Sequence, residues 1–219
     1  FSRGDKEMPE IIEKTKPVFR LMTHSIMGIS EPLFRALNTK LYFIDVVRNP
    51  LSILKANYKL NKGYESINGI KRQFKIYCIT DGKEIPYWAM SFKEEYLNMN
   101  VMEKTIYELK YKSEKSNKFK INHKDLYDKY CLTVPFESFV KEPIEYMKKI
   151  ANLIKEKKSS NYKKLIKKYK IPRKNDVNST FKDEIIDFAR KKGANENAIK
   201  SLIELSYRYE SFLSNINYD

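Results

Sequence analysis

Short apolar runs alternate with helical patterns along the chain. The run over 41–47, LYFIDVV, is rich in β-branched and aromatic residues and has the length of a buried parallel strand. Asn49 and Pro50 follow it and favour the start of a helix, because asparagine is a good N-cap and proline fits the first helical position. Val18–Met22 and Leu132–Phe136 predict two further strands. This order favours one sheet in which the first two strands are parallel and helices cover the faces.

The segment over 63–99 interrupts this alternation. Phe74–Thr80 and Lys83–Ala89, joined by Asp81 and Gly82, predict a β-hairpin, because an Asp-Gly pair tolerates the positive φ angles of a tight turn. A long excursion of this kind between strands is typical of a lid or binding loop.

Helical patterns occupy most of the second half. Asn100 predicts the start of a helix over 101–112, and we expect the polar stretch over 113–120 to be a loop. The region over 155–219 is basic and helical, with two helices split by Gly193 at its end. We find no internal repeat, so the 219 residues are interpreted as a single domain.

The charge favours an anionic partner. The formal net charge is +15 and the isoelectric point is near 9.5, which suits a nucleotide phosphate, a sulfated glycan or nucleic acid. The alternative is the codon bias of an AT-rich genome, because Lys, Asn, Ile and Tyr are abundant throughout and solvated lysines need no ligand. No apolar run reaches the roughly 18 residues of a membrane-spanning helix, so we expect no membrane span.

The two cysteines favour a reducing compartment. Cys78 and Cys131 lie in apolar stretches without metal-ligand spacing, so we expect buried free thiols and no metal site. The chain begins with Phe1 and shows no signal peptide, so we expect the true N-terminus to be missing. A cytoplasmic location is the resulting expectation.

Arg48 is the first candidate for ligand binding. It follows the strand over 41–47 directly, and the next helix would aim free N–H groups and the positive end of its dipole at an anion beside it. A phosphate is the expected occupant. The alternative is an arginine that simply pairs with a surface carboxylate.

Three segments together resemble a PAPS-dependent sulfotransferase, where PAPS is 3′-phosphoadenosine 5′-phosphosulfate. They are Thr23-His24-Ser25, then Arg48-Asn49-Pro50, and then Phe136–Pro143, in the family's order, and the resemblance spans Pro17 to Ile154. It implies an α/β, three-layer, P-loop-like fold with a central parallel sheet flanked by helices. The family's N-terminal strand and its 5′-phosphosulfate loop have no counterpart here. The resemblance therefore implies an N-terminally truncated domain that is inactive as given.

The resemblance also assigns the donor site. His24 aligns with the catalytic base, and a histidine suits this step because its pKa lies near working pH. Arg48 aligns with the arginine that grips the 3′-phosphate of PAPS. The family's serine eight positions later is replaced by Ala56, and either Ser52, one turn earlier, or the adjacent Asn57 could substitute for it. Arg173 and Lys174 resemble a basic pair that closes over the same phosphate, or they belong to an ordinary basic loop.

The acceptor side is expected in the excursion over 63–99. There the resemblance makes Tyr87 and Trp88 acceptor-binding candidates, although both could simply pack the hairpin onto the core. Glu137 is implied to be structural. If His24 is structural, Glu31 and Glu84 are the next candidates for proton removal.

These assignments lead to one main function and two alternatives. The main expectation is transfer of a sulfonate from PAPS to a hydroxyl of a glycan or small metabolite, with no metal and without nucleic acid as a partner. One alternative is a non-enzymatic basic module in which Lys155–Lys174 bind nucleic acid or acidic glycans. The other is a P-loop-like kinase, for which the chain lacks a Walker-type lysine.

Overall fold

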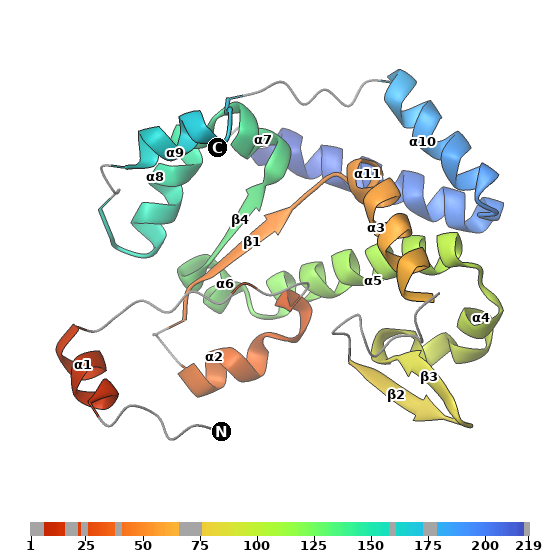
Figure 1. The fold of residues 1–219 in the computed structure, drawn as a ribbon, viewed down its shortest axis with the longest axis horizontal. Coiled ribbons are helices and arrows are strands. Elements are labelled where there is room, and N and C mark those ends of the chain that lie inside the picture. Colours follow the sequence, from red (N-terminus) through yellow and green to blue (C-terminus); the bar gives the residue numbers. More distant parts are fainter. Residues whose placement is uncertain are drawn as a thin grey trace.

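The computed structural model describes residues 7–15, 22, 26–37, 41–65, 76–157, 161–172 and 179–216 (Figure 1). They form an α/β structure that is mostly helical, with one parallel and one antiparallel pair of strands. In chain order the elements are α1 (Met8–Thr15), η1 (Met27–Ile29), α2 (Glu31–Leu37), β1 (Phe43–Val47), α3 (Pro50–Glu65), β2 (Tyr77–Thr80), β3 (Lys83–Pro86), η4 (Tyr87–Phe92), α4 (Lys93–Asn98), α5 (Val101–Asn122), α6 (Lys124–Tyr130), β4 (Cys131–Pro135), α7 (Phe136–Lys141), α8 (Pro143–Leu153), α9 (Tyr162–Lys168), α10 (Ser179–Lys191) and α11 (Glu196–Ile216).

Several predicted features fall outside these ranges. The predicted strand over 18–22 does so except for Met22, which is 81% exposed and belongs to no strand. The candidates His24, Arg173 and Lys174 also lie outside the described residues.

The parallel sheet consists of β1 and β4. Phe43 pairs with Cys131, and the register continues to Val47 and Pro135, which confirms that the strands predicted near 41–47 and 132–136 share one sheet. Because parallel strands end at the same edge, the residues that follow β1 and β4 meet there (Figure 1). This edge is where ligands bind in open α/β sheets.

The prediction that the strand over 41–47 is a buried strand is wrong. Asp45 faces α5, but Ile44 is 40% exposed and Val46 is 61% exposed on the opposite face. The physical reason is that, within the described ranges, β1 has one neighbour strand only, and α8 packs against β4 without covering β1. A parallel strand is normally covered on both faces, so this face of β1 is incompletely packed.

The largest buried cluster lies among helices α3, α5, α10 and α11 rather than on the sheet. Leu51 and Leu54 of α3 pack there against Met102, Ile106 and Leu202, and all of them are at most 2% exposed. The first turn of α3 is therefore fixed by the core. The turn that carries Arg48 is anchored with it.

Helix α5 is much longer than predicted. The predicted cap is confirmed, because Asn100 and Glu103 form a capping box, but the loop expected over 113–120 is wrong because α5 continues to Asn122. Lysine and glutamate are good helix formers, and the stretch contains no glycine or proline. Phe119, only 5% exposed, holds this end of α5 against η1 and α2.

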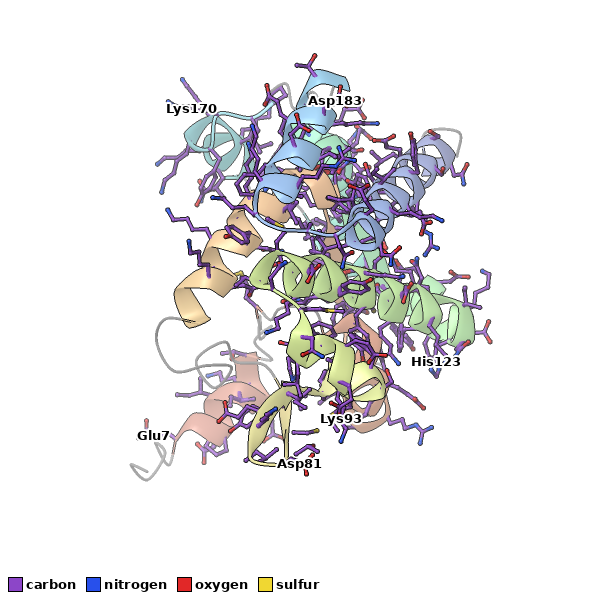
Figure 2. The ribbon with its side chains drawn as sticks, turned by 90° about the vertical axis from the view of Figure 1, so that its right-hand side faces the viewer. Glu7, Asp81, Lys93, His123, Lys170 and Asp183 are labelled. Atoms are coloured by element: carbon purple, nitrogen blue, oxygen red, sulfur yellow. The ribbon has the colours of Figure 1, made fainter. Side chains whose placement is uncertain are left out.

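The predicted hairpin is confirmed, but its second arm ends at Pro86, and Tyr87–Ala89 belong to the 3-10 helix η4. Strands β2 and β3 pair in antiparallel fashion around Asp81 and Gly82, whose φ angles of 52° and 71° suit the tight turn. Figure 2 shows the hairpin tip at Asp81 and the end of α5 at His123, on different sides of the molecule. Ile85, Trp88 and Tyr96 belong to a separate hydrophobic cluster that joins the hairpin to α4.

The C-terminal region is helical, as predicted. Gly193 separates α10 from α11 with a φ of 88°, and its carbonyl accepts a hydrogen bond of 2.7 Å from the Asn100 amide. Both cysteines are free, Cys131 being buried and Cys78 half-buried. Within the described ranges, no helix has the length and apolar character needed to cross a membrane.

Candidate functional site

Arg48 and Glu137 meet where β1 and β4 end. Arg48 follows β1 directly, and Glu137 lies in the first turn of α7, which follows β4. The distance from Arg48 Nε to Glu137 Oε1 is 3.7 Å, and the guanidinium carbon lies 4.6 Å from the centre of the Phe136 ring. The Glu137 side chain is 7% exposed and that of Arg48 is 40% exposed. One end of the guanidinium therefore faces the protein while the other is near solvent.

Glu137 has two further donors. The backbone N–H of Asn49 donates to Oε1 over 3.2 Å, and the hydroxyl of Tyr209, from α11, donates to Oε2. Burial raises the pKa of Tyr209 well above its usual value, and the bond to Glu137 adds to this effect. We call Arg48, Asn49, Glu137 and Tyr209 the Glu137 cluster. It joins both strand ends to the C-terminal helix.

The prediction that the α3 N-terminus offers free N–H groups is wrong. Asn49 caps the helix as predicted, and its Oδ1 accepts the N–H of Leu51 over 2.9 Å. The N–H of Ser52 donates to the Asn49 carbonyl over 3.0 Å, and Pro50 has no N–H. The first backbone donors are thus already used. A carboxylate of the protein, Glu137, lies at this helix end, but it is buried and is not the surface carboxylate of the alternative interpretation.

Two groups remain available for an external anion. Within the described ranges, the Nη groups of Arg48 have no hydrogen-bond acceptor, and a guanidinium can present such a pair to a phosphate. Ser52 lies in the first turn of α3, is half-buried, and its hydroxyl has no partner among the described residues. Ala56, one turn later, is exposed and contributes no polar group.

The two acceptor candidates lie elsewhere. Tyr87 and Trp88 begin η4, directly after the hairpin, and Figures 1 and 2 both show α5 between the hairpin and the start of α3. Trp88 is 6% exposed and packs against Phe92, Tyr96 and Tyr111, and its indole N–H has no acceptor within the described ranges. Tyr87 is half-buried and bonded to Tyr111, whose pKa is raised mainly by burial.

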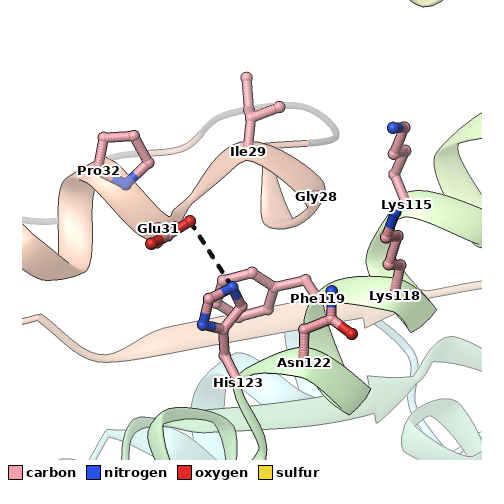
Figure 3. A pocket seen from close by; sticks show the side chains of 9 residues that line it. All are labelled: Gly28, Ile29, Glu31, Pro32, Lys115, Lys118, Phe119, Asn122 and His123. Carbon is pink, nitrogen blue, oxygen red and sulfur yellow. Dashed lines mark ion pairs between the residues drawn. The ribbon is translucent and has the colours of Figure 1, made fainter.

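A hollow of about 370 Å³ lies at the opposite end of the strands, between α2 and the C-terminal end of α5. Figure 3 shows Glu31 and His123 pointing toward each other inside it, and Nε2 of His123 lies 3.7 Å from Glu31 Oε2. Glu31 also pairs with Arg35. The hollow is lined by Gly28, Ile29, Glu31, Pro32, Lys115, Lys118, Phe119, Asn122 and His123.

The sequence analysis did not identify Tyr209 of the Glu137 cluster or His123 of the hollow as site residues. Tyr209 lies 72 positions after Glu137 and belongs to an amphipathic helix, so no local pattern connects the two. His123 lies in a polar stretch, and its pairing with Glu31 depends on the unexpected length of α5. Within the described ranges, no three His, Cys, Asp or Glu residues form a group that could hold a metal ion.

The comparisons with known proteins find no similarity to report. No protein-family model matches the chain, and neither a curated protein nor a solved structure matches it.

Proposed function

We propose that this chain is a PAPS-dependent sulfotransferase domain in which Arg48 binds the 3′-phosphate of the donor nucleotide. The reaction is transfer of a sulfonate to a hydroxyl of a glycan or small metabolite. The proposal includes a three-layer, P-loop-like fold, in which β1 and β4 belong to a larger parallel sheet. The exposed face and unpaired edge of β1 among the described residues support such an extension.

The geometry of Arg48 carries this proposal. Arg48 lies at the carboxyl edge of a parallel pair of strands and at the N-terminus of a 16-residue helix. Its Nε faces Glu137 and its ring contact with Phe136 covers one side of the guanidinium, so the Nη groups are the remaining donors. Because the N–H groups of α3 are used internally, the proposal depends on these Nη groups and the Ser52 hydroxyl.

The other assignments complete the proposal. His24 would remove the acceptor proton, and Arg173 and Lys174 would approach the 3′-phosphate from the C-terminal side. Tyr87 and Trp88 would contact the acceptor, and Tyr87 is the more accessible of the two. Their separation from Arg48 is compatible with this, because the transferred sulfonate is at the opposite end of the donor from its 3′-phosphate.

The test compares two nucleotides that differ only in the 3′-phosphate. Calorimetry should show that 3′-phosphoadenosine 5′-phosphate binds more tightly than AMP. Arg48→Ala should remove most of the difference, because a lost charge-assisted hydrogen bond of about 1.5–3 kcal/mol corresponds to roughly 10- to 150-fold in affinity. Arg35→Ala is the matched control, since this side chain is 79% exposed on α2. Equal binding of both nucleotides by the unchanged protein contradicts the assignment.

A second candidate function is binding of polyanions such as acidic glycans through α9. Its lysines, Lys163, Lys164, Lys167 and Lys168, are exposed, and none forms an ion pair with a described residue. No acidic residue occurs between Glu156 and Asp176. This function predicts affinity for any polyanion that falls steeply with salt, whereas the Arg48 site predicts a preference for one phosphate position.

A further inference from the structure

Tyr209 connects the C-terminal helix to the arginine at the other end of the Glu137 cluster. Its side chain is buried, being 9% exposed, and its hydroxyl donates to Oε2 of Glu137. The other carboxylate oxygen, Oε1, faces the Asn49 N–H and Arg48 Nε. Each oxygen of this carboxylate is thus engaged by a different part of the chain.

This division decides which atoms of Arg48 remain free. A carboxylate and a guanidinium prefer a bidentate pairing with two parallel N–H···O bonds. Here the ion pair joins Arg48 Nε to Glu137 Oε1 at 3.7 Å, which is longer than a hydrogen bond, while the Tyr209 hydroxyl donates to Oε2. Without that hydroxyl, Oε2 would be buried without a donor beside the Arg48 guanidinium, whose Nη groups have no acceptor among the described residues. The arginine would then turn toward Glu137.

We propose that Tyr209 is a positioning residue for ligand binding: by donating to Glu137 Oε2, it keeps the Nη groups of Arg48 available to the 3′-phosphate of the donor. The inference rests on the proposed function of Arg48. The inference extends the site to α11, because the affinity for the donor nucleotide then depends on Tyr209, a side chain that does not touch the nucleotide.

The experiment measures two affinities for each variant of the chain. The probes are 3′-phosphoadenosine 5′-phosphate and AMP, and their ratio reports the contact with the 3′-phosphate alone. Tyr209→Phe should weaken binding of the first by about 3- to 10-fold and leave AMP unchanged. The phenyl ring retains the packing against Phe212, whose ring centre lies 6.5 Å away, so the fold is maintained. Tyr207→Phe, at a 62% exposed position of the same helix, is the matched control and should change neither affinity.

A second background tests whether Tyr209 acts through Glu137. In a Glu137→Gln protein the negative charge that draws Arg48 inward is gone, so adding Tyr209→Phe should change the ratio less than twofold. Non-additivity of this kind is the signature of residues that act in one network.

The outcomes separate the two proposals. If the unchanged protein binds both nucleotides equally, the function proposed for Arg48 fails. If it discriminates and Tyr209→Phe keeps the full ratio, the function stands and the role of Tyr209 is overturned. Equal weakening of both nucleotides also overturns this role, because it shows that Tyr209 supports the fold only.

Discussion

Arg48 and Lys120 both face a carboxylate at the parallel sheet, but their surroundings differ. Nζ of Lys120 lies 3.3 Å from Asp45 Oδ2 and donates a 3.0 Å hydrogen bond to Thr133 Oγ1. It also lies over the rings of Tyr127 and Phe212, at 5.3 Å and 5.7 Å from their centres. We call Asp45, Ser116, Lys120, Tyr127 and Thr133 the Lys120 cluster. The ammonium group of Lys120 is surrounded by protein groups, whereas the guanidinium of Arg48 is partly open to solvent.

The comparison shows how a structural cation differs from a candidate ligand-binding one. The Lys120 side chain is only 19% exposed. The neighbouring Cys131 thiol also reflects this burial, because desolvation raises its pKa to about 12 and the charge of Asp45 adds to the effect. The Arg48 side chain is 40% exposed, with its Nε 3.7 Å from Glu137 Oε1 and its guanidinium over the Phe136 ring. A cation whose partners are all protein groups stabilises the fold. A partly exposed guanidinium whose Nη groups have no acceptor among the described residues can bind an anion.

The largest expected effect is on Glu137. Glu137→Ala should lower the free energy of unfolding by about 3–5 kcal/mol, because it removes a buried acceptor from Asn49 and Tyr209 and leaves Arg48 unpaired. Urea unfolding measures this change. The control Glu95→Ala, at an exposed position of α4, should stay within about 0.5 kcal/mol. A loss below about 1 kcal/mol would show that the Glu137 cluster behaves as a surface contact.

A smaller effect is expected in the Lys120 cluster. Lys120→Met should cost roughly 2–3 kcal/mol in the same measurement, because Asp45 keeps only the Ser116 hydroxyl, at 3.3 Å. The cost is smaller than for Glu137 because the Asp45 side chain is 16% exposed and water can reach it. Lys118→Met, at an exposed position of the same helix, is the control. If both variants unfold alike, Lys120 is no more structural than a surface lysine.

The sequence predicts local structure well where one residue type determines the backbone. The Asp81-Gly82 turn, the Asn49 and Asn100 caps and the break at Gly193 are all found. The prediction of a loop over 113–120 is wrong because this polar stretch continues helix α5. Its one buried apolar residue, Phe119, is too little to produce a helical pattern in the sequence. Burial of β1 could not be predicted, since it depends on which elements cover Ile44 and Val46.

The candidate site is predicted only in part, for the same reason. The turn from β1 into α3 places Arg48 at the strand edge, as the sequence indicates. Its partners come from α7 and α11, and a contact across 72 residues leaves no local pattern. The sequence also could not show that the first N–H groups of α3 donate to Asn49. An asparagine before a helix is compatible both with N–H groups bonded to its own oxygens and with N–H groups left for a ligand.

The smallest effect on stability is expected for Arg48 itself. Arg48→Met should change the free energy of unfolding by only about 0–1 kcal/mol, because water replaces the exposed part of the guanidinium and Glu137 keeps Asn49 and Tyr209 as donors. The same urea series that includes Lys120→Met measures it. A cost as large as that of Lys120→Met would place Arg48 with the structural cations and leave no reason to expect a ligand there. A near-zero change in the free energy of unfolding, combined with loss of the preference for the 3′-phosphate, would show that the Nη donors serve binding. A residue that serves the fold alone would instead lower the free energy of unfolding and leave the nucleotide preference unchanged.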